Sequence, residues 1–260
     1  MDYTLTDTHC HITCDDLFER IDDVIENAKR HHVGRMLIVC TNFKEFERAK
    51  SLKKQHPAIF DIALGFHPND LYKFEEKDYV RLESLLQHHE LCALGEIGLD
   101  AVWCKTPMEK QKEVFEKQLQ LGQQLHKPIL LHLKGMEKEA LPLLRKYPNT
   151  YLVHWYSCDD YLEDYMALDC WFTIGPSVGD DPAVTKVARK ISLQRMLIES
   201  DGIDAIRWCE QKEVPLAAYR TYLTRSITRI AALHQIAEAS LAAQLMDNYH
   251  HFLNKCESSV

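Results

Sequence analysis

Asp7-Thr8-His9-Cys10-His11 follows the first apolar run of the chain and decides how the rest of the sequence is interpreted. In an extended segment residues i and i+2 point to the same side, so His9 and His11 can reach one divalent ion together. An isolated pair of this kind is also compatible with two structural histidines bonded to the backbone. The metal interpretation therefore depends on whether later strands end in ligand-type residues as well.

Seven further short apolar runs follow, separated by longer amphipathic stretches, and this alternation is typical of a parallel β/α fold. The expected strands are Tyr3–Asp7, Arg35–Cys40, Phe60–Gly65, Cys92–Glu96, Pro128–His132, Thr150–His154, Trp171–Gly175 and Arg195–Glu199. The spacing of apolar residues predicts helices over Asp15–His31 and Met108–Leu125. The tail from Leu216 to Leu253 is expected to form two helices without a further strand.

The ends of these strands distinguish a closed barrel from an open sheet. Six of them finish in segments that contain metal-binding side chains: Asp7–His11, Gly65–Pro68, Gly95-Glu96, Leu131-His132, Val153-His154 and Glu199–Asp201. In a closed barrel such ends converge on one mouth, whereas an open doubly wound sheet spreads them along an edge. The sequence therefore predicts an α/β fold, a TIM-type (β/α)8 barrel with C-terminal helices, in which residues 1–260 form a single domain.

Each strand-end residue also has a structural explanation when taken alone. Glu96 ends a buried strand, where a carboxylate is costly unless it is paired with a cationic side chain or bound to metal, and it can bridge two ions. His132 and His154 are either ligands or core histidines bonded to a carbonyl group. Asp201 is either a ligand or the N-cap of the next helix. Their combination with His9 favours the metal interpretation.

Composition limits the class of protein. The formal net charge of −8 argues against a protein that coats nucleic acid through a basic face, but it leaves room for a nuclease whose ions supply positive charge locally. Nine scattered cysteines without a Cys-x-x-Cys pair predict reduced thiols and a cytoplasmic location. The first residues do not resemble a signal peptide, and no apolar run approaches the ~18 residues of a membrane span. We expect a monomer or weak oligomer.

These segments resemble the TatD family of metal-dependent deoxyribonucleases, within the amidohydrolase superfamily. The most specific match is Gly95-Glu-Ile-Gly-Leu-Asp100. The others are Asp7–His11, Gly65-Phe-His-Pro68, Pro128–His132, His154 with Ser157, Glu199-Ser-Asp201, and the helical stretch from Gln111 to Leu121. The matches occur in order along nearly the whole chain.

The resemblance implies a barrel that holds one to three divalent ions, and we expect two, of Mg²⁺, Mn²⁺ or Zn²⁺. By similarity, the first ion is held by His9, His11, Glu96 and Asp201, and the second by Glu96, His132 and His154. Glu199 is implied to contribute to a further ion. The catalytic residues implied are Asp201, His67 and Glu96, with His67 beside the scissile phosphate and Asp201 accepting a proton from the attacking water.

Three segments depart from the family pattern, and they fall where the substrate rim is expected: Ala101–Cys104, Lys134-Gly135 and Gly202–Pro215. The expected phosphate contacts are Lys105, Lys134 and Arg207. The expected base-stacking residues are Trp103, Trp155 and Tyr156, although each of these aromatic side chains also fits a core position.

The function expected is hydrolysis of phosphodiester bonds in DNA by metal-activated water, with DNA as the partner. One alternative is a small-molecule amidohydrolase that opens a cyclic amide, lactone or phosphotriester on the same metal site. Such enzymes often carry a bridging lysine on the fourth strand, where this chain has Glu96. A subunit that has lost catalysis is a third interpretation, and the full set of expected ligands argues against it.

Overall fold

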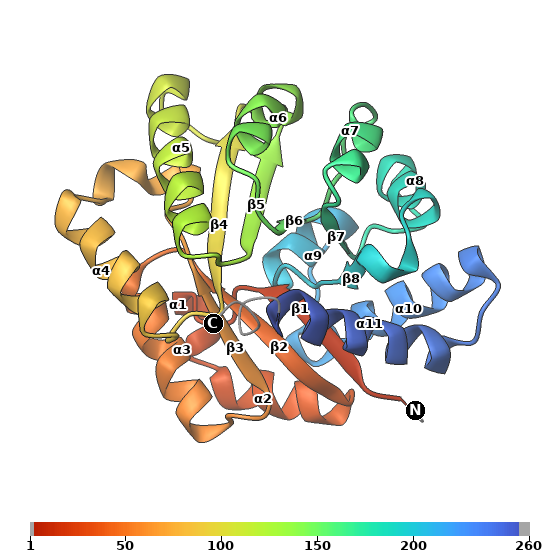
Figure 1. The fold of residues 1–260 in the computed structure, drawn as a ribbon. Coiled ribbons are helices and arrows are strands. Elements are labelled where there is room, and N and C mark those ends of the chain that lie inside the picture. The colour runs from red at the N-terminus through yellow and green to blue at the C-terminus, as the bar shows by residue number, and fades with distance from the viewer. Residues whose placement is uncertain (1–2, 255–260) are drawn as a thin grey trace.

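The computed structural model describes residues 3–254, in which eight parallel strands follow one another in chain order around a nearly closed barrel (Figure 1). The strands are β1 (Leu5–Cys10), β2 (Val33–Cys40), β3 (Phe60–Leu64), β4 (Ala93–Asp100), β5 (Ile129–Lys134), β6 (Tyr151–Val153), β7 (Trp171–Ile174) and β8 (Met196–Ile198). Just past the last strand, the Asp201 amide donates a 3.0 Å hydrogen bond to the His9 carbonyl and so joins β8 to β1. The predicted single-domain TIM barrel is confirmed.

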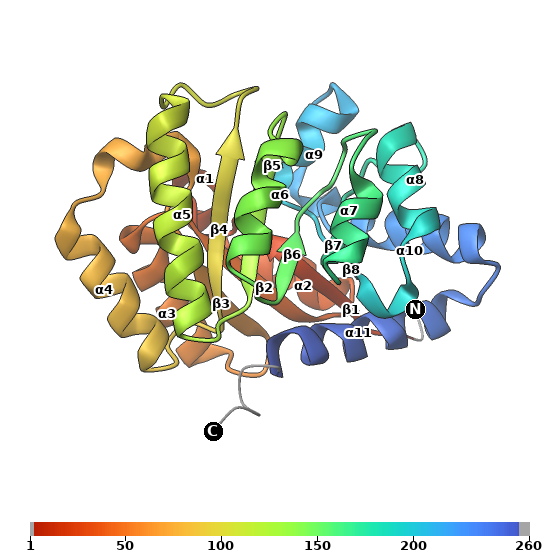
Figure 2. The same cartoon turned by 45° about the horizontal axis from the view of Figure 1, so that its top comes forward.

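Helices surround the strands (Figure 2). They are α1 (Asp15–Phe18), α2 (Ile21–Arg30), α3 (Phe43–Gln55), α4 (Glu76–Gln87), α5 (Met108–Gln124), α6 (Glu137–Lys146), α7 (Leu162–Ala167), α8 (Pro182–Lys190), α9 (Ile203–Glu210), α10 (Thr221–His234) and α11 (Glu238–Asn254), with short 3-10 helices η1 (Pro68–Lys73), η2 (Leu193–Arg195) and η3 (Leu216–Ala218). The prediction of a single helix over Asp15–His31 was wrong. The backbone leaves the helical region at Arg20 (φ −121°, ψ 29°) and separates α1 from α2.

Three strands run further than their apolar runs indicated. Strand β1 continues to Cys10, β4 to Asp100 and β5 to Lys134. His9 therefore lies inside a strand that was expected to end at Asp7, and Glu96 lies in the middle of a strand that was expected to end at that residue. The expected boundaries were too early because polar side chains replace apolar ones on the inward side as the strands approach the mouth. Fully buried polar residues thus belong to the barrel itself.

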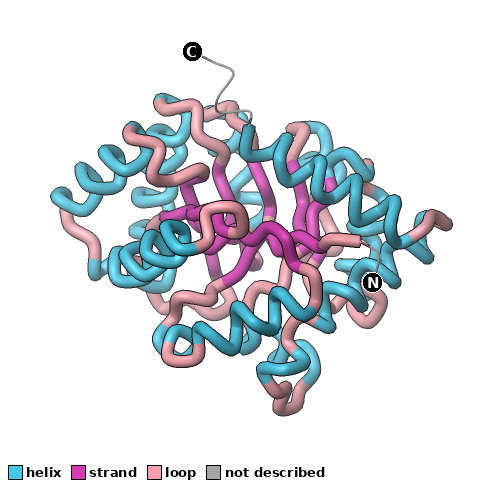
Figure 3. The backbone as a smooth tube through the Cα atoms, turned by 90° about the horizontal axis from the view of Figure 1, so that it is seen from below, coloured by secondary structure: helices cyan, strands magenta, loops and turns pink. Residues whose placement is uncertain are grey.

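The barrel interior below these polar residues is a continuous apolar core. It contains Leu37, Val39, Ala63, Ala93, Leu130, Leu152, Trp171 and Leu197. Helix α11 adds Tyr249 and Phe252 to this group and lies across the amino-terminal end of the barrel (Figure 3). The Asn248 side chain fixes the helix there by donating to the carbonyls of Leu193 and Met196 at 2.6 and 2.7 Å. One end of the barrel is therefore closed, and access is left to the other.

The described residues can also be compared with two predictions made from composition, the absence of a membrane span and the reduced state of the cysteines. Between residues 3 and 254, no helix has both the length and the apolar character needed to cross a bilayer. The cysteines in this part of the chain form no disulfide with one another. Cys256 lies outside the described residues.

A fully buried ion pair joins β1 to the segment before α10. The Arg220 guanidinium contacts the Asp7 carboxylate, and neither side chain is exposed. Asp7 also accepts hydrogen bonds from the Ser200 amide at 2.9 Å and the Ser200 hydroxyl at 2.6 Å. Asp7 was expected to join the residues at the barrel mouth, but it instead anchors the backbone next to Asp201.

We expect Arg220→Met to lower the free energy of unfolding by about 3–5 kcal/mol, because the substitution leaves the Asp7 charge buried without its cation. Urea unfolding of the wild type and the variant measures this difference. Asp7→Asn combined with Arg220→Met should recover part of the loss, since the uncompensated charge is then removed. A loss below about 1 kcal/mol in the single variant would show that the pair is not needed for stability.

Candidate metal centre

The polar strand ends meet at the open mouth of the barrel. His9 lies on β1, Glu96 on β4 and His132 on β5, while His11, His67, His154 and Asp201 follow β1, β3, β6 and β8. Three overlapping groups among them have ligand atoms that all lie within 4.8 Å of one another. These groups are His9, Glu96 and His154; His9, His11 and Asp201; and His67, Glu96 and His132. The structure thus brings together residues that are up to 192 positions apart, from His9 to Asp201.

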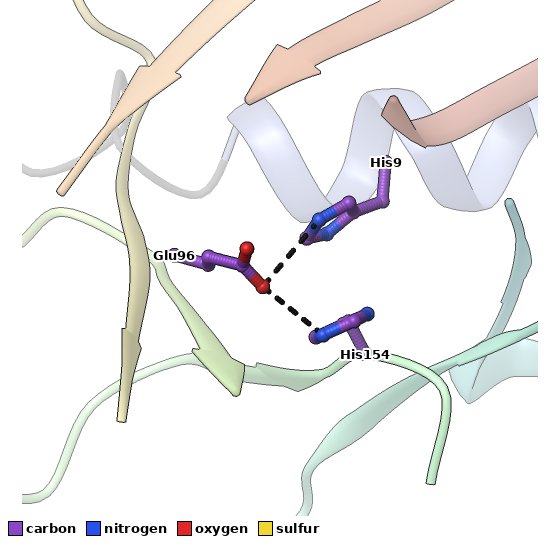
Figure 4. A group of neighbouring side chains, drawn as sticks. All are labelled: His9, Glu96 and His154. Atoms are coloured by element: carbon purple, nitrogen blue, oxygen red, sulfur yellow. Dashed lines mark ion pairs between the residues drawn. The ribbon is translucent and has the colours of Figure 1, made fainter. Parts of the chain in front are cut away.

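Glu96 lies at the centre of these groups. Its Oε2 is 3.0 Å from His154 Nε2, 3.5 Å from His132 Nδ1 and 3.6 Å from His9 Nε2, and the contacts with His9 and His154 are drawn in Figure 4. Its Oε1 is 3.4 Å from His11 Nε2 and 3.7 Å from His67 Nε2. One carboxylate therefore faces five imidazole rings, three of them through Oε2 and two through Oε1.

Asp201 completes the side of the site nearest β1. Its Oδ1 is 3.4 Å from His11 Nε2 and 3.6 Å from His9 Nε2, and its side chain is 19% exposed to the cavity side. Its backbone has φ 57°, a left-handed conformation that aspartate and asparagine tolerate better than most residues. Asp201 is thus held at the mouth by local backbone geometry as well as by its neighbours.

The proton positions on two histidines indicate that a cation fits here. His11 Nδ1 lies 3.0 Å from the Val39 carbonyl, so the proton of the neutral ring is on Nδ1 and Nε2 presents a lone pair to Glu96 and Asp201. His132 Nε2 is 3.1 Å from Asp100 Oδ2, which likewise leaves the Nδ1 lone pair facing Glu96. Acceptors that face one another across 3–4 Å need a cation or extra protons between them.

An unpartnered buried atom points the same way. Glu96 Oε2 makes no hydrogen bond within the described residues, although it faces the Nε2 atoms of His9 and His154. Leaving such atoms buried and unsatisfied is costly. A donor set of imidazole nitrogens and carboxylate oxygens suits Zn²⁺, Mn²⁺ or Mg²⁺. The residues present therefore fit divalent ions.

The charges of the site are strongly interdependent. Burial opposes ionisation of Glu96, but the surrounding histidines, first His154, then His67 and His9, hold the pKa of its carboxyl well below the usual range. Burial likewise opposes a charged His154, yet Glu96 and Glu199 raise the pKa of His154 to about 10. For Asp201, the close His11 ring and the other nearby histidine rings outweigh burial and lower the pKa to about 2. Both site carboxylates are therefore ionised near neutral pH.

His67 differs from the other histidines. Its Nδ1 accepts a hydrogen bond from the Asn69 amide at 3.2 Å, so the proton of the neutral ring is on Nε2. Burial is the main cause that lowers the pKa of His67, to about 4. The ring is therefore neutral near pH 7 and presents an N–H donor toward the mouth, a better arrangement for binding an anionic oxygen than for ligating an ion.

Glu199 lies behind two of the rings. Its Oε1 is 3.6 Å from His154 Nδ1 and its Oε2 is 3.9 Å from His9 Nδ1, whereas Glu96 faces the Nε2 atoms of the same rings. Glu199 is fully buried, and burial raises the pKa of its carboxyl. This position suits orientation of the His9 and His154 rings, and the contribution of Glu199 to a further ion stays a prediction.

Three supporting residues were not singled out from sequence. Asp100 accepts hydrogen bonds from the amides of Val102 and Trp103 through Oδ1 and contacts His132 through Oδ2. From α5, Gln111 bonds the backbone of Asp100 in both directions, and Gln118 does the same for Phe66, next to His67. Two features of the sequence could have indicated these supporting residues. Asp100 ends the Gly-Glu-Ile-Gly-Leu-Asp string, and the two glutamines lie on the apolar face of a predicted helix.

We expect Asp100→Asn to weaken metal binding by about 10- to 100-fold while leaving the fold intact. Burial opposes ionisation of Asp100, but its contact with His132 and its backbone hydrogen bonds hold the pKa at about 2, so it is a charged acceptor that fixes the His132 ring. Competition with a chelator of known affinity measures the change. Asp164→Asn, a surface aspartate paired with Arg145, is the matched control and should bind metal like the wild type. Equal affinity in Asp100→Asn would contradict this role.

A cavity of about 350 Å³ opens over these ligands. It is lined by Trp103, His132, Lys134, His154, Trp155, Ser157, Asp181, Asp201, Ala205 and Trp208. Three of the six expected rim residues, Trp103, Lys134 and Trp155, are thus on its walls. Trp208 was not expected on this wall, and the only signal for it in the sequence was a tryptophan within the divergent segment Gly202–Pro215.

The other three expected rim residues lie elsewhere. Tyr156 is buried against Tyr165 and Phe172, and its hydroxyl donates to the Asp160 carbonyl, so it is a core aromatic. Arg207 pairs with Asp204 on the surface of α9. Lys105 is exposed and does not line this cavity.

The chain is similar to known metal-dependent hydrolases. The family model described as TatD related DNase matches residues 6–254. The metal-dependent hydrolase YabD of Bacillus subtilis is 28% identical over 203 residues, which cover 76% of this chain and 79% of YabD. The 3'-5' ssDNA/RNA exonuclease TatD of Edwardsiella piscicida is 27% identical over 189 residues, covering 70% and 73%.

A solved structure shares the fold. The Escherichia coli TatD homologue YJJV superposes with a TM-score of 0.84 at 22% identity, over 96% of this chain and 98% of that one.

Proposed function

Because this chain belongs to the family of TatD-related DNases and is a metal-dependent hydrolase, we propose that it hydrolyses phosphodiester bonds in DNA. The observation that carries the proposal is the Glu96 carboxylate, surrounded by five imidazole rings below a cavity that also contains Lys134. A phosphodiester is anionic and resists attack by water. A site that combines cations with a lysine offsets both the negative charge of the phosphodiester and its resistance to attack by water.

We assign two divalent ions to the cluster. His9, His11 and Asp201 would hold one ion. His132 and His154, whose Nδ1 and Nε2 atoms lie 3.2 Å apart, would hold the other, with Glu96 shared between the two ions. When bound, the ions supply a nucleophile from water at neutral pH and offset negative charge on the phosphate. Glu199 holds the rings of His9 and His154 from behind.

The chain's own residues would carry the remaining steps. Asp201, ionised and partly open to the cavity, accepts the proton of the attacking water. His67 donates a hydrogen bond from Nε2–H to a phosphate oxygen and keeps its proton, because Nδ1 already accepts a hydrogen bond from the Asn69 amide. Lys134, held 3.0 Å from the Trp155 carbonyl, supplies a fixed positive charge at the rim.

End-labelled substrates test this function directly. Protein reconstituted with Mg²⁺, Mn²⁺ or Zn²⁺ is incubated with single- and double-stranded DNA, with RNA, and separately with a lactone and a cyclic amide. Cleavage of DNA with release of shorter labelled products is expected. Opening of the lactone or cyclic amide without cleavage of any nucleic acid would replace the proposal with a small-molecule amidohydrolase.

A further inference from the structure

A buried polar cluster joins the first strand of the barrel to the segment that follows the last. Asp7 Oδ1 accepts a hydrogen bond from the Ser200 amide at 2.9 Å, and Asp7 Oδ2 accepts one from the Ser200 hydroxyl at 2.6 Å. Asp7 Oδ2 also contacts the Arg220 guanidinium. All three residues are fully buried. Both oxygens of Asp7 are therefore engaged by donors of the protein itself.

This cluster lies directly beside two residues of the candidate metal centre. Asp7 is two residues before His9, and Ser200 is the residue before Asp201. The His9 carbonyl accepts a hydrogen bond from the Asp201 amide at 3.0 Å, so β1 holds two consecutive residues after β8, once through a side chain and once through its backbone. Asp201 (φ 57°) and Gly202 (φ 106°) both have positive φ values. The direction of the Asp201 carboxylate therefore depends on how the residue before it is held.

Arg220 connects this contact to the helices around the barrel. It lies between η3 and α10, and its amide donates a hydrogen bond to Asn27 Oδ1 of α2 at 3.3 Å. Its guanidinium lies 4.0 Å from the Tyr219 ring centroid and donates to the Ser200 hydroxyl at 3.3 Å. The Tyr219 hydroxyl is in turn 2.9 Å from the Ser200 hydroxyl. Arg220 is therefore held from α2 and from its own segment, and it fixes the Asp7 carboxylate that it contacts.

Resting on the metal site of the proposed function, we propose that Asp7 and Arg220 are positioning residues for one ion. The ligands that they position are His9 on β1 and Asp201 after β8. Asp7 holds the end of β8 against β1, and Arg220 neutralises Asp7 and keeps its oxygens on Ser200. Without Arg220, the Asp7 carboxylate would be an unpaired anion beside a site that attracts cations. Removal of a group that orients the ligands of an ion typically weakens metal binding by about 10- to 100-fold.

Two variants test the proposal through metal binding, separately from hydrolysis. Asp7→Leu combined with Arg220→Met replaces the ion pair by apolar side chains of similar size, so its urea midpoint should lie above that of Arg220→Met alone. Its affinity for Mn²⁺ or Zn²⁺, measured by competition with a chelator, should nevertheless be about 10- to 100-fold below that of the wild type. Ser200→Ala removes one hydroxyl and leaves the two charges paired. It should show a smaller loss of metal affinity, with a urea midpoint close to that of the wild type.

The visible absorption of bound Co²⁺ is a second readout, because it depends on the arrangement of the ligands, and both variants should change it. Ser226→Ala is the matched control, since Ser226 is an equally buried serine whose hydroxyl donates to the Tyr222 carbonyl at 3.1 Å. It should keep the affinity and the spectrum of the wild type. Metal affinity that recovers together with the urea midpoint in the double variant, or wild-type affinity in Ser200→Ala, would overturn the proposal. If both variants bind metal more weakly while the reconstituted wild type cleaves no phosphodiester, the proposed function fails and the positioning role stands.

Discussion

Glu96→Gln is expected to remove most of the bound metal and to lower phosphodiester hydrolysis by about 10²- to 10³-fold or more. The substitution keeps the size of the side chain but replaces a charged oxygen by an NH₂ group. The Glu96 oxygens face five imidazole rings at 3.0–3.7 Å, so the loss affects both halves of the site together. Elemental analysis of the purified variant, followed by hydrolysis at a fixed metal concentration, measures both effects.

Glu163→Gln is the matched control, because Glu163 is an exposed glutamate that pairs with Lys190 on the surface. It should keep the metal content and the rate of the wild type. Among single-ligand variants, His132→Ala should disturb mainly one ion, and its metal loss should not exceed that of Glu96→Gln. Full metal content in Glu96→Gln would refute a bridging role for this carboxylate.

Asp201→Asn is expected to keep much of its metal and yet to lose hydrolysis by about 10²-fold or more. Asparagine retains an oxygen for the ion but cannot accept a proton from water near neutral pH. It also tolerates the left-handed backbone at this position, φ 57°, so the loop should not rearrange. Rates on DNA and on a small aryl phosphodiester, compared at equal metal occupancy, separate the loss of the base from the loss of a ligand.

Asp169→Asn is a suitable control for this experiment. Asp169 has φ 56°, nearly the same backbone conformation, but lies on the surface and pairs with Arg195. This variant should retain the rate of the wild type. A near wild-type rate in Asp201→Asn on both substrates would show that Asp201 is not the base and serves only as a ligand or as part of the turn.

The architecture could be predicted from sequence because two patterns repeat along the chain. Buried parallel strands appear in the sequence as short apolar runs, and the residues of the candidate metal site recur where those runs stop. Both the barrel and the residues at its mouth could therefore be predicted. The same rule produced the errors at β1 and β4, where His9 and Glu96 interrupt the apolar run before the strand ends. Runs of apolar residues identify strands that are buried in an apolar core. They do not identify the part of a strand whose inward-facing side chains are polar.

Other features depend on tertiary contacts that no local pattern encodes. Asp7 precedes His9 in the same motif, yet it faces Arg220, which is 213 positions away along the chain. Tyr156 and Trp155 are adjacent, but only the second lines the cavity. Trp208 reaches the rim because α9 folds back over the mouth, and its partner Trp103 belongs to a different loop. Only the fold therefore shows which side chains line the same wall of the cavity.

Metal titration of the ion-free protein tests the central claim most directly. Mn²⁺, Mg²⁺ or Zn²⁺ is added in steps while cleavage of end-labelled single-stranded DNA and the bound metal per chain are measured together. The account predicts no cleavage without metal, followed by a rise that reaches its plateau at about two bound ions per chain. Cleavage by the ion-free protein, or no cleavage of DNA when the site is saturated with any of the three ions, would contradict it.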